Sequence, residues 1–346
     1  MKRLILGLVI LILIAIPVNA LEFSPPEAPD SALPYMPDET DNFGEGLLFV
    51  IREAVRKTQP GFAEAAGVCA IAIGISIGIG MLSCLSDNKD MIFNLAGTLI
   101  VSILLLQPAK SFIQLSIQTI GEISQYGKML LPVMTGAMAA QGGVTKSAAL
   151  YAGTAFFNML LSSLISEILM PLVYVYICVS IVTRVFPGQV LDELRKFLKW
   201  LMIWGLKTIL YVFTGYIGIT GIVSGSTDAA MLKATKLTIS GMVPVVGGVL
   251  SDASEAVLVS AGLVKNSAGI YGLLVVAALW IGPFLKIGIQ YLCLKITGGI
   301  CRMIGTKNIG DVIGDFSETM GILLAMTGSM CLIVLISTVC FMKGVV

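Results

Sequence analysis

The amino-acid sequence predicts an all-α polytopic membrane protein with about 8–10 transmembrane segments. The chain has 346 residues, 56% of them hydrophobic and 12% charged, and its mean hydropathy is +0.94. A soluble domain carries roughly 25% charged residues, so this composition leaves too little polar surface to cover a fold in water. A second observation is an internal repeat with a lag of about 112 residues, in which each copy begins with a Pro/Gly-broken helix.

The composition also excludes several kinds of site. The chain contains no histidine, which removes His-based catalytic triads and most zinc and iron sites. Its seven cysteines lie in apolar stretches without a CxxC pair, a pattern typical of small buried hydrophobic residues. The net charge is +1 and the basic residues are scattered, which does not favour nucleic-acid binding. We therefore expect no catalytic residue, no metal and no cofactor.

Residues 1–20 are predicted to be a signal peptide. A basic head precedes an apolar run of 13 residues, and small residues end at Ala20, where a signal peptidase would cut. The run is shorter than the roughly 20 residues that a spanning helix needs, although an uncleaved anchor is the alternative. In both cases residues 21–62 are expected outside the membrane, as a poorly packed, proline-rich tether followed by an amphipathic helix over 43–60.

Residues 63–129 are predicted to hold two spans, 63–85 and 91–106, and then a separate amphipathic helix. On that helix, polar side chains recur every three or four residues and form a polar stripe. The stripe has two interpretations: an interfacial helix with its polar side in water, or a face that lines a pore or contacts another subunit. The residues of the polar stripe are Gln107, Gln114, Gln118, Glu122 and Gln125.

The repeat divides the remaining chain into two membrane repeats, residues 130–241 and 242–346. The segment LPVMTG, which starts at Leu131, returns as VPVVGG, and Pro171 is answered by Pro283. A proline inside a helix leaves a carbonyl group unpaired, and in a bilayer that group needs another partner. In transporters, such discontinuous helices mark binding sites near the middle of the membrane.

The two predicted breaks form the candidate functional centre, in which the acids would meet a cation, water or a basic partner. The alternative is a kinked packing helix whose acids lie at the interface. The residues of this centre are Pro132, Thr135, Gly136, Pro244, Gly247, Gly248, Asp252 and Glu255.

Basic residues predict the topology. If both broken segments cross the membrane, the basic groups at 184–199 and 295–307 lie on the cytoplasmic side, as the positive-inside rule favours. Re-entrant segments would place the first group outside, and the shortness of the segment at 129–140 favours that alternative. We expect four crossings in each repeat, so that the two repeats are parallel.

The segment AMLKATKLTISGMVPVVGGVLSDA, residues 230–253, resembles the most characteristic block of the stage III sporulation protein AE family. The signal peptide, the tether and the two-copy membrane region are also similar to that family, so the resemblance covers nearly the whole chain. It implies a multi-pass protein of endospore-forming bacteria, located in the mother-cell membrane that surrounds the forespore. It also implies partners, namely the other stage III A sporulation proteins and stage II sporulation protein Q. Together these proteins form a channel or secretion-like complex that sustains forespore development.

Three functions are weighed for the chain. The expected one is a membrane component of such a channel complex, and the alternatives are a membrane scaffold without transport of its own and an independent secondary transporter of a small solute. Self-association into a homo-oligomer is also considered. The sequence has no HExxH, paired-aspartate or GxSxG motif and no P-loop, so we do not expect an enzyme.

Overall fold

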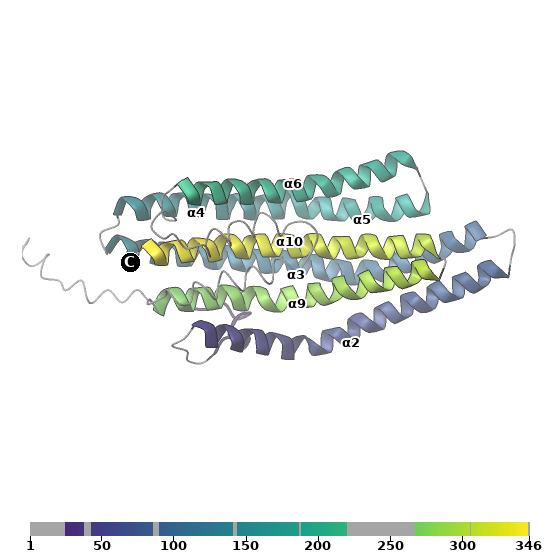
Figure 1. Cartoon of the computed structure of the whole chain (residues 1–346), viewed down its shortest axis with the longest axis horizontal. Coiled ribbons are helices and arrows are strands. Elements are labelled where there is room, and N and C mark those ends of the chain that lie inside the picture. The colour runs from purple at the N-terminus through teal and green to yellow at the C-terminus, as the bar shows by residue number, and fades with distance from the viewer. Residues whose placement is uncertain are drawn as a thin grey trace, which may run out of the picture.

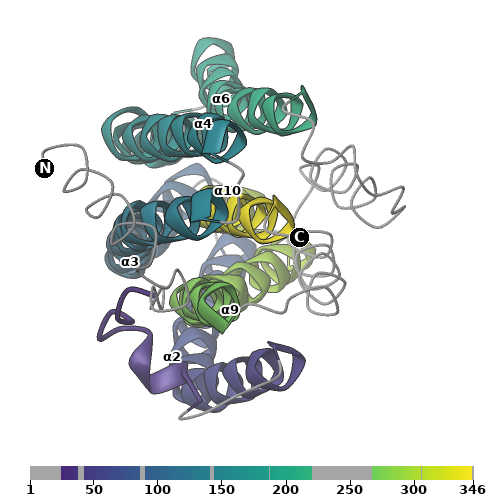
Figure 2. The same cartoon turned by 90° about the vertical axis from the view of Figure 1, so that its left-hand side faces the viewer.

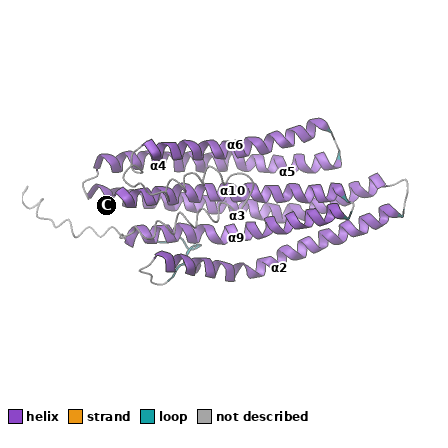
Figure 3. Ribbon diagram, in the orientation of Figure 1, coloured by secondary structure: helices purple, strands orange, loops and turns teal. Residues whose placement is uncertain are grey.

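A computed structural model describes residues 25–37, 43–85, 90–140, 144–186, 188–219, 267–304 and 306–344. All regular structure in these ranges is helical (Figure 3). The family-like block at 230–253, with the second predicted break, lies outside the described residues.

The helices run back and forth along one long axis (Figure 1). In chain order they are η2 (Leu33–Tyr35), α2 (Phe43–Cys84), α3 (Asp90–Ala140), α4 (Val144–Ser163), the π-helical segment η3 (Leu164–Leu169), α5 (Met170–Val185), α6 (Gln189–Ile219), α9 (Ser267–Met303) and α10 (Lys307–Gly344). Six stretches among the described residues are long and apolar enough to cross a membrane, and the α4–η3–α5 run counts as one of them. The all-α, membrane-type fold is therefore confirmed. The total of about 8–10 crossings stays a prediction, because residues 220–266 are not described.

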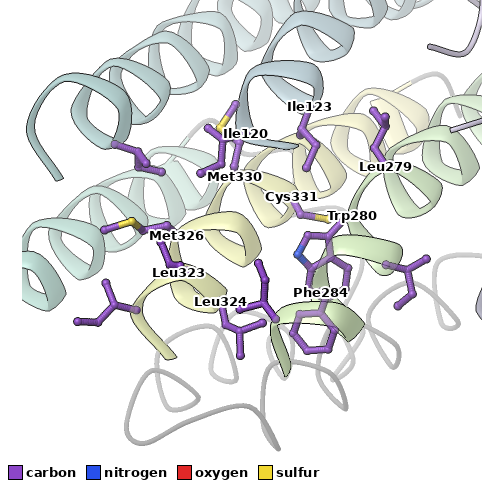
Figure 4. Close-up of a cluster of buried hydrophobic side chains, with 14 of the residues drawn as sticks. Ile120, Ile123, Leu279, Trp280, Phe284, Leu323, Leu324, Met326, Met330 and Cys331 are labelled. Atoms are coloured by element: carbon purple, nitrogen blue, oxygen red, sulfur yellow. The ribbon is translucent and has the colours of Figure 1, made fainter. Parts of the chain in front are cut away.

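Helices α9 and α10 form the core of the bundle. In their most apolar stretches 78% and 83% of the residues are buried, against 28% to 39% in the other four. Seen end-on, α3 and α10 lie between α4 and α6 on one side and α9 and α2 on the other (Figure 2). Trp280 and Phe284 of α9 pack with ring centroids 4.3 Å apart, beside Cys331 of α10 (Figure 4). The exposed sides of the outer helices are accordingly the surfaces that meet lipid, water or partners.

Two helices are longer than the sequence analysis predicts. Helix α2 joins the amphipathic helix over 43–60 to the first span, 63–85, and passes through Pro60. Helix α3 joins the second span to the helix of the polar stripe and passes through Pro108 and Pro132. Each proline costs roughly 3 kcal/mol inside a helix. However, α2 packs along α9 and α3 packs along α10, and this continuous burial outweighs the lost hydrogen bonds.

The helix break predicted at Pro132–Gly136 is wrong. Helix α3 continues through these residues to Ala140. Pro132 and Lys128 are exposed, so the carbonyl group that the proline leaves unpaired lies at the surface of the bundle, where water or lipid headgroups can satisfy it. The proline is therefore tolerated without a discontinuous helix.

The prolines that match between the two repeats have different local structures. Pro283 lies inside the regular helix α9. Pro171 instead begins α5, directly after η3, a π-helical segment of six residues. A proline ring clashes with the carbonyl group four residues earlier, and the wider winding of a π-helix relieves that clash. The internal repeat itself stays a prediction.

The described part of the N-terminal tether packs on the bundle, which corrects the prediction of a poorly packed segment. Ser31 Oγ donates a hydrogen bond to Glu122 Oε2 of α3 at 2.6 Å, and Lys57 Nζ of α2 donates to the carbonyl oxygen of Pro34 at 3.0 Å. Lys57 Nζ also lies 5.2 Å from the centroid of the Tyr35 ring, and burial raises the pKa of the Tyr35 phenol. The tether is therefore docked against α2 and α3.

Candidate functional site

Charged side chains from four helices meet near the end of the bundle where α5 and α9 end and α6 and α10 begin (Figure 1). Arg184, at the end of α5, donates from Nε to Asp315 Oδ2 of α10 at 2.9 Å, and its Nη1 lies 3.4 Å from Asp311 Oδ2. Arg195 of α6 donates from Nη1 to Asp315 Oδ1 at 2.6 Å. Asp315 therefore accepts hydrogen bonds from arginines of two different helices.

Further ion pairs extend this arrangement along the same end of the bundle. Arg302 of α9 donates from Nε to Asp311 Oδ1 at 2.8 Å. Lys199 Nζ of α6 lies 3.0 Å from Glu318 Oε1 of α10, and Tyr176 of α5 donates its hydroxyl to Glu318 Oε2 at 2.9 Å. We call the following eight residues the charge cluster: Arg184, Asp192, Arg195, Lys199, Arg302, Asp311, Asp315 and Glu318.

Local sequence explains how the charge cluster forms. Asp311, Asp315 and Glu318 follow one another at intervals of four and three residues, so they share one face of α10. Two glycines let α9 and α10 approach closely at this point. A Cβ atom on Gly310 would lie 2.7 Å from the carbonyl oxygen of Gly298. This close approach lets the side chain of Arg302 lie across α10 and reach Asp311.

The electrostatics of the charge cluster are balanced, with four basic and four acidic side chains. The side chain of Asp315 is 5% exposed, and those of Arg184 and Arg195 are 20% and 14% exposed. Charges removed from water in this way are tolerated only when they are paired. The arrangement therefore ties α5 and α6 to α9 and α10.

The residues of the polar stripe share one outward-facing side of α3. The four glutamines are exposed, and Glu122 is half-buried. Glu122 accepts a hydrogen bond from Gln118 Nε2 at 2.8 Å as well as the one from Ser31. Because the stripe continues the same helix as the second span, it does not lie on a separate interfacial helix as predicted. The alternative, a pore-lining or subunit-contact face, stays a prediction.

The candidate functional centre is described only in part. Pro132, Thr135 and Gly136 lie near the end of α3 that is far from the charge cluster. The second part of the centre lies outside the described residues, so its packing against the first part stays a prediction. It comprises Pro244, Gly247, Gly248, Asp252 and Glu255.

Sequence patterns did not predict Asp315, Glu318 or Tyr176 as site residues. A usable signal was present, because three acids at helical spacing in an otherwise apolar helix need basic partners. The partners themselves lie 119 or more residues away in sequence, apart from Arg302, so only the packing of the helices could identify them.

The described residues contain no group of three or more His, Cys, Asp or Glu side chains that could hold a metal ion. Cys69, Cys301 and Cys331 are buried free thiols. The ion pairs of the charge cluster hold its four helices together. The exposed polar stripe can hydrogen-bond to water or to another chain.

Six long apolar helical stretches, two of which form the buried core, define a multi-pass helical membrane protein. The chain belongs to the stage III sporulation protein AE family, whose family model matches residues 73–344. It is 24% identical over 221 residues to the stage III sporulation protein AE of Bacillus subtilis (strain 168). That match covers 63% of this chain and 55% of the relative, so it spans about half of the relative's length. No solved structure matches the chain.

Proposed function

We propose that the chain is an integral membrane component of a multi-protein channel or secretion-like complex that connects mother cell and forespore during endospore formation. The observation that carries this proposal is the family match over residues 73–344, which includes most of the six apolar helical stretches. The proposed partners are the other stage III A sporulation proteins and stage II sporulation protein Q. The proposed location is the mother-cell membrane around the forespore, with the N-terminal segment extracytoplasmic.

The described interior of the bundle favours a role within an assembly over a pore through this chain alone. Its buried hydroxyl side chains largely bond carbonyl groups of their own helix, as Thr327, Ser329 and Thr338 do in α10. Apolar side chains fill the space around them. A conduit would therefore form between this chain and other subunits. The polar stripe on α3 has the exposed amide groups that such a wall needs.

A membrane scaffold is the second candidate function. The charge cluster joins four helices into one unit, which suits a chain that holds partners in place and passes no solute itself. An independent secondary transporter has less support, because the first predicted helix break is a continuous helix. Neither role requires a catalytic residue, a cofactor or a metal from this chain.

The polar stripe provides the experiment that tests the proposal. A Gln114→Leu, Gln118→Leu double variant keeps the helix and removes two exposed amides. We expect it to reduce spore yield at an unchanged protein level, while the control Leu160→Val, on the outer side of α4, leaves spore yield unchanged. Wild-type spore yield from the double variant would contradict a function for this face.

Co-purification then separates the channel from the scaffold. If the stripe lines a conduit, the other stage III A proteins remain bound to the double variant while spore yield falls. If it is a docking face of a scaffold, the partners are lost together with spore yield. Flux of a small solute into vesicles that contain the purified complex would support the channel directly.

A further inference from the structure

Two groups of exposed apolar residues lie on different sides of the bundle, apart from those that α5 and α9 also expose. On the first side, residues 65–86 of the α2 region and 91–109 of α3 contain no charged side chain. This uncharged part is the half nearest the end of α2 and the start of α3. Beyond it, α2 carries charged residues and α3 presents the polar stripe. We call the exposed apolar residues here the α2–α3 belt: Ile71, Ile77, Met81, Leu82, Ile92, Leu99, Ile100 and Ile103.

On the opposite side of the bundle the order is reversed. Helix α6 carries five charged residues between 192 and 199, near its N-terminal end, and becomes apolar from Trp200 onward. One charged residue, the half-buried Lys207, lies between Trp200 and the end of α6. The rings of Phe197, Trp200 and Trp204 stack at successive centroid distances of 5.9 Å where the charged part ends. We call the exposed apolar residues here the α4–α6 belt: Tyr151, Phe156, Met159, Trp200, Trp204, Tyr211 and Val212.

Contacts through the core show that these opposite patterns lie at the same heights along the bundle. Gly97 of α3 packs against Ile309 of α10, and the two helices run in the same direction (Figure 1). Nine residues further along each helix are Leu106 and Glu318, and Glu318 pairs with Lys199 of α6. The uncharged part of α3 therefore ends at the height where the apolar part of α6 begins.

A second contact fixes the height of α2. Ser76 shares a hydrogen bond with Thr306, just before α10. Helices α2 and α10 run in opposite directions, so Ile71 of α2 lies level with Asp311, which pairs with Arg184. Ile71 is 54% exposed in a stretch without charges. The uncharged, exposed surface of α2 around Ile71 thus lies at the same height along the bundle as the charge cluster.

We propose that the bundle crosses the bilayer obliquely, with acyl chains covering both belts. The α2–α3 belt lies close to the end of the bundle where α2 ends and α3 begins, and the α4–α6 belt lies further from that end. The hydrocarbon core is about 30 Å thick and matches about 20 helical residues. An upright slab of that thickness would cover either the α2–α3 belt and the five charges of α6, or the α4–α6 belt and the polar stripe. An oblique slab covers both belts and leaves both polar surfaces in water.

The aromatic residues agree with this placement. Trp and Tyr side chains concentrate where a membrane meets water. Trp200 and Trp204 lie next to the charged part of α6, and so at one edge of the α4–α6 belt. The charge cluster then lies just outside the hydrocarbon at this edge. The placement goes beyond the proposed function, under which the polar stripe would line the part of the conduit that lies outside the hydrocarbon.

Spin labels at two height-matched pairs of positions test the proposal. The first pair is Ile71→Cys on α2 and Glu193→Cys on α6, next to the charge cluster. The second pair is Gln125→Cys on α3 and Val212→Cys on α6. This pair is level because Ser124 bonds Asn158 of α4, and five residues away Gly153 packs against Tyr216 of α6. Each variant is made in the full-length chain without its native cysteines and placed in phosphatidylcholine–phosphatidylglycerol vesicles.

The measured quantity is the collision rate of each label with oxygen, which concentrates in lipid, relative to that with a water-soluble nickel chelate. We expect the ratio to be several-fold higher at Ile71 than at Glu193, and several-fold higher at Val212 than at Gln125. Equal ratios within either pair would show an upright crossing and overturn the proposal. A label at Val212 that is shielded from both reagents would show that protein covers the α4–α6 belt, which also overturns it.

Discussion

At the scale of single residues, Asp315 has the most demanding position among the described charges. Its side chain is almost fully buried and accepts hydrogen bonds from Arg184 and Arg195, which come from different helices. If one member of a buried ion pair is removed, the remaining charge stays in a low-dielectric environment without compensation. Stability should therefore depend on this residue far more than on the exposed charges of α6.

We expect Asp315→Asn to lower the free energy of unfolding by about 3 kcal/mol, because both arginines lose their charged acceptor. The measurement is thermal or denaturant unfolding of the protein purified in detergent. Glu193→Gln is the matched control, since the Glu193 side chain is 65% exposed and pairs with the exposed Lys196. Its effect should stay below about 1 kcal/mol. Equal free energies of unfolding for the two variants would show that the charge cluster does not stabilise the fold.

A pair of glycines tests the close approach of α9 and α10. Gly310→Ala would place a Cβ atom 2.7 Å from the carbonyl oxygen of Gly298, so the helices must separate. We expect a loss of about 1–3 kcal/mol in the free energy of unfolding. Gly299→Ala meets no atom within 4 Å and should be neutral or slightly stabilising. The same unfolding assay checks both, and an unchanged midpoint for Gly310→Ala would be the contrary result.

The candidate functional centre is a prediction from sequence at the same scale. Asp252 and Glu255 are three residues apart, so on a helix they share a face. We expect Asp252→Leu to abolish spore formation while the amount of inserted protein stays normal. The control Leu160→Val, which exchanges one exposed apolar residue for another, should leave spore yield unchanged. Normal spore yield from both Asp252→Leu and Asp252→Asn would contradict a functional centre here. The alternative interpretation of the segment, a kinked packing helix, would then remain.

At the scale of helices, apolar periodicity predicted where the helical stretches lie but not where they end. Prolines and polar residues favoured boundaries near 60 and 107, yet α2 and α3 continue through both. The reason is tertiary, because α2 packs against α9 and α3 packs against α10. The π-helical segment Leu164–Leu169 was likewise not predicted. Its only sequence signal is Pro171, two residues after its end.

The docked N-terminal segment gives a prediction at this scale. We expect a Ser31→Ala, Lys57→Ala double variant to release residues 25–37 from α2 and α3, because it removes the contacts with Glu122, Pro34 and Tyr35. Limited proteolysis of the purified protein should then cut this segment faster. Lys110→Ala, an exposed lysine on α3, is the control and should leave the cleavage rate unchanged. An equal cleavage rate in the double variant would mean that other contacts hold the segment.

At the scale of the whole molecule, composition alone was sufficient to predict a multi-pass helical membrane protein. It was not sufficient for the arrangement, because apolar residues occur on every helix whether they face the core or lipid. The central place of α9 and α10, and the meeting of α5, α6, α9 and α10 in the charge cluster, depend on which faces pack together. The second predicted break lies outside the described residues and stays a prediction.

The topology can be tested on the whole molecule. Lys196 and Lys307 are exposed and lie at the same end of the bundle (Figure 1). We expect cysteines at these two positions, in a chain without native cysteines, to react with a membrane-impermeant maleimide only from the cytoplasmic side, as the positive-inside rule predicts. A cysteine at Gln118 should react only from the other side. Labelling of positions 196 and 307 from outside would reverse the topology.

The π-helical segment also determines the rotational phase of the helix that follows it. One residue advances an α-helix by about 100° around its axis, and a π-helical turn accommodates one extra residue. The angular position of every α5 side chain relative to α4 is therefore set by the winding of Leu164–Leu169. If the same six residues wound as a regular α-helix, α5 would turn by about 100°. Arg184 would then point away from Asp315, and the uncharged outer face of α5 would rotate toward α10.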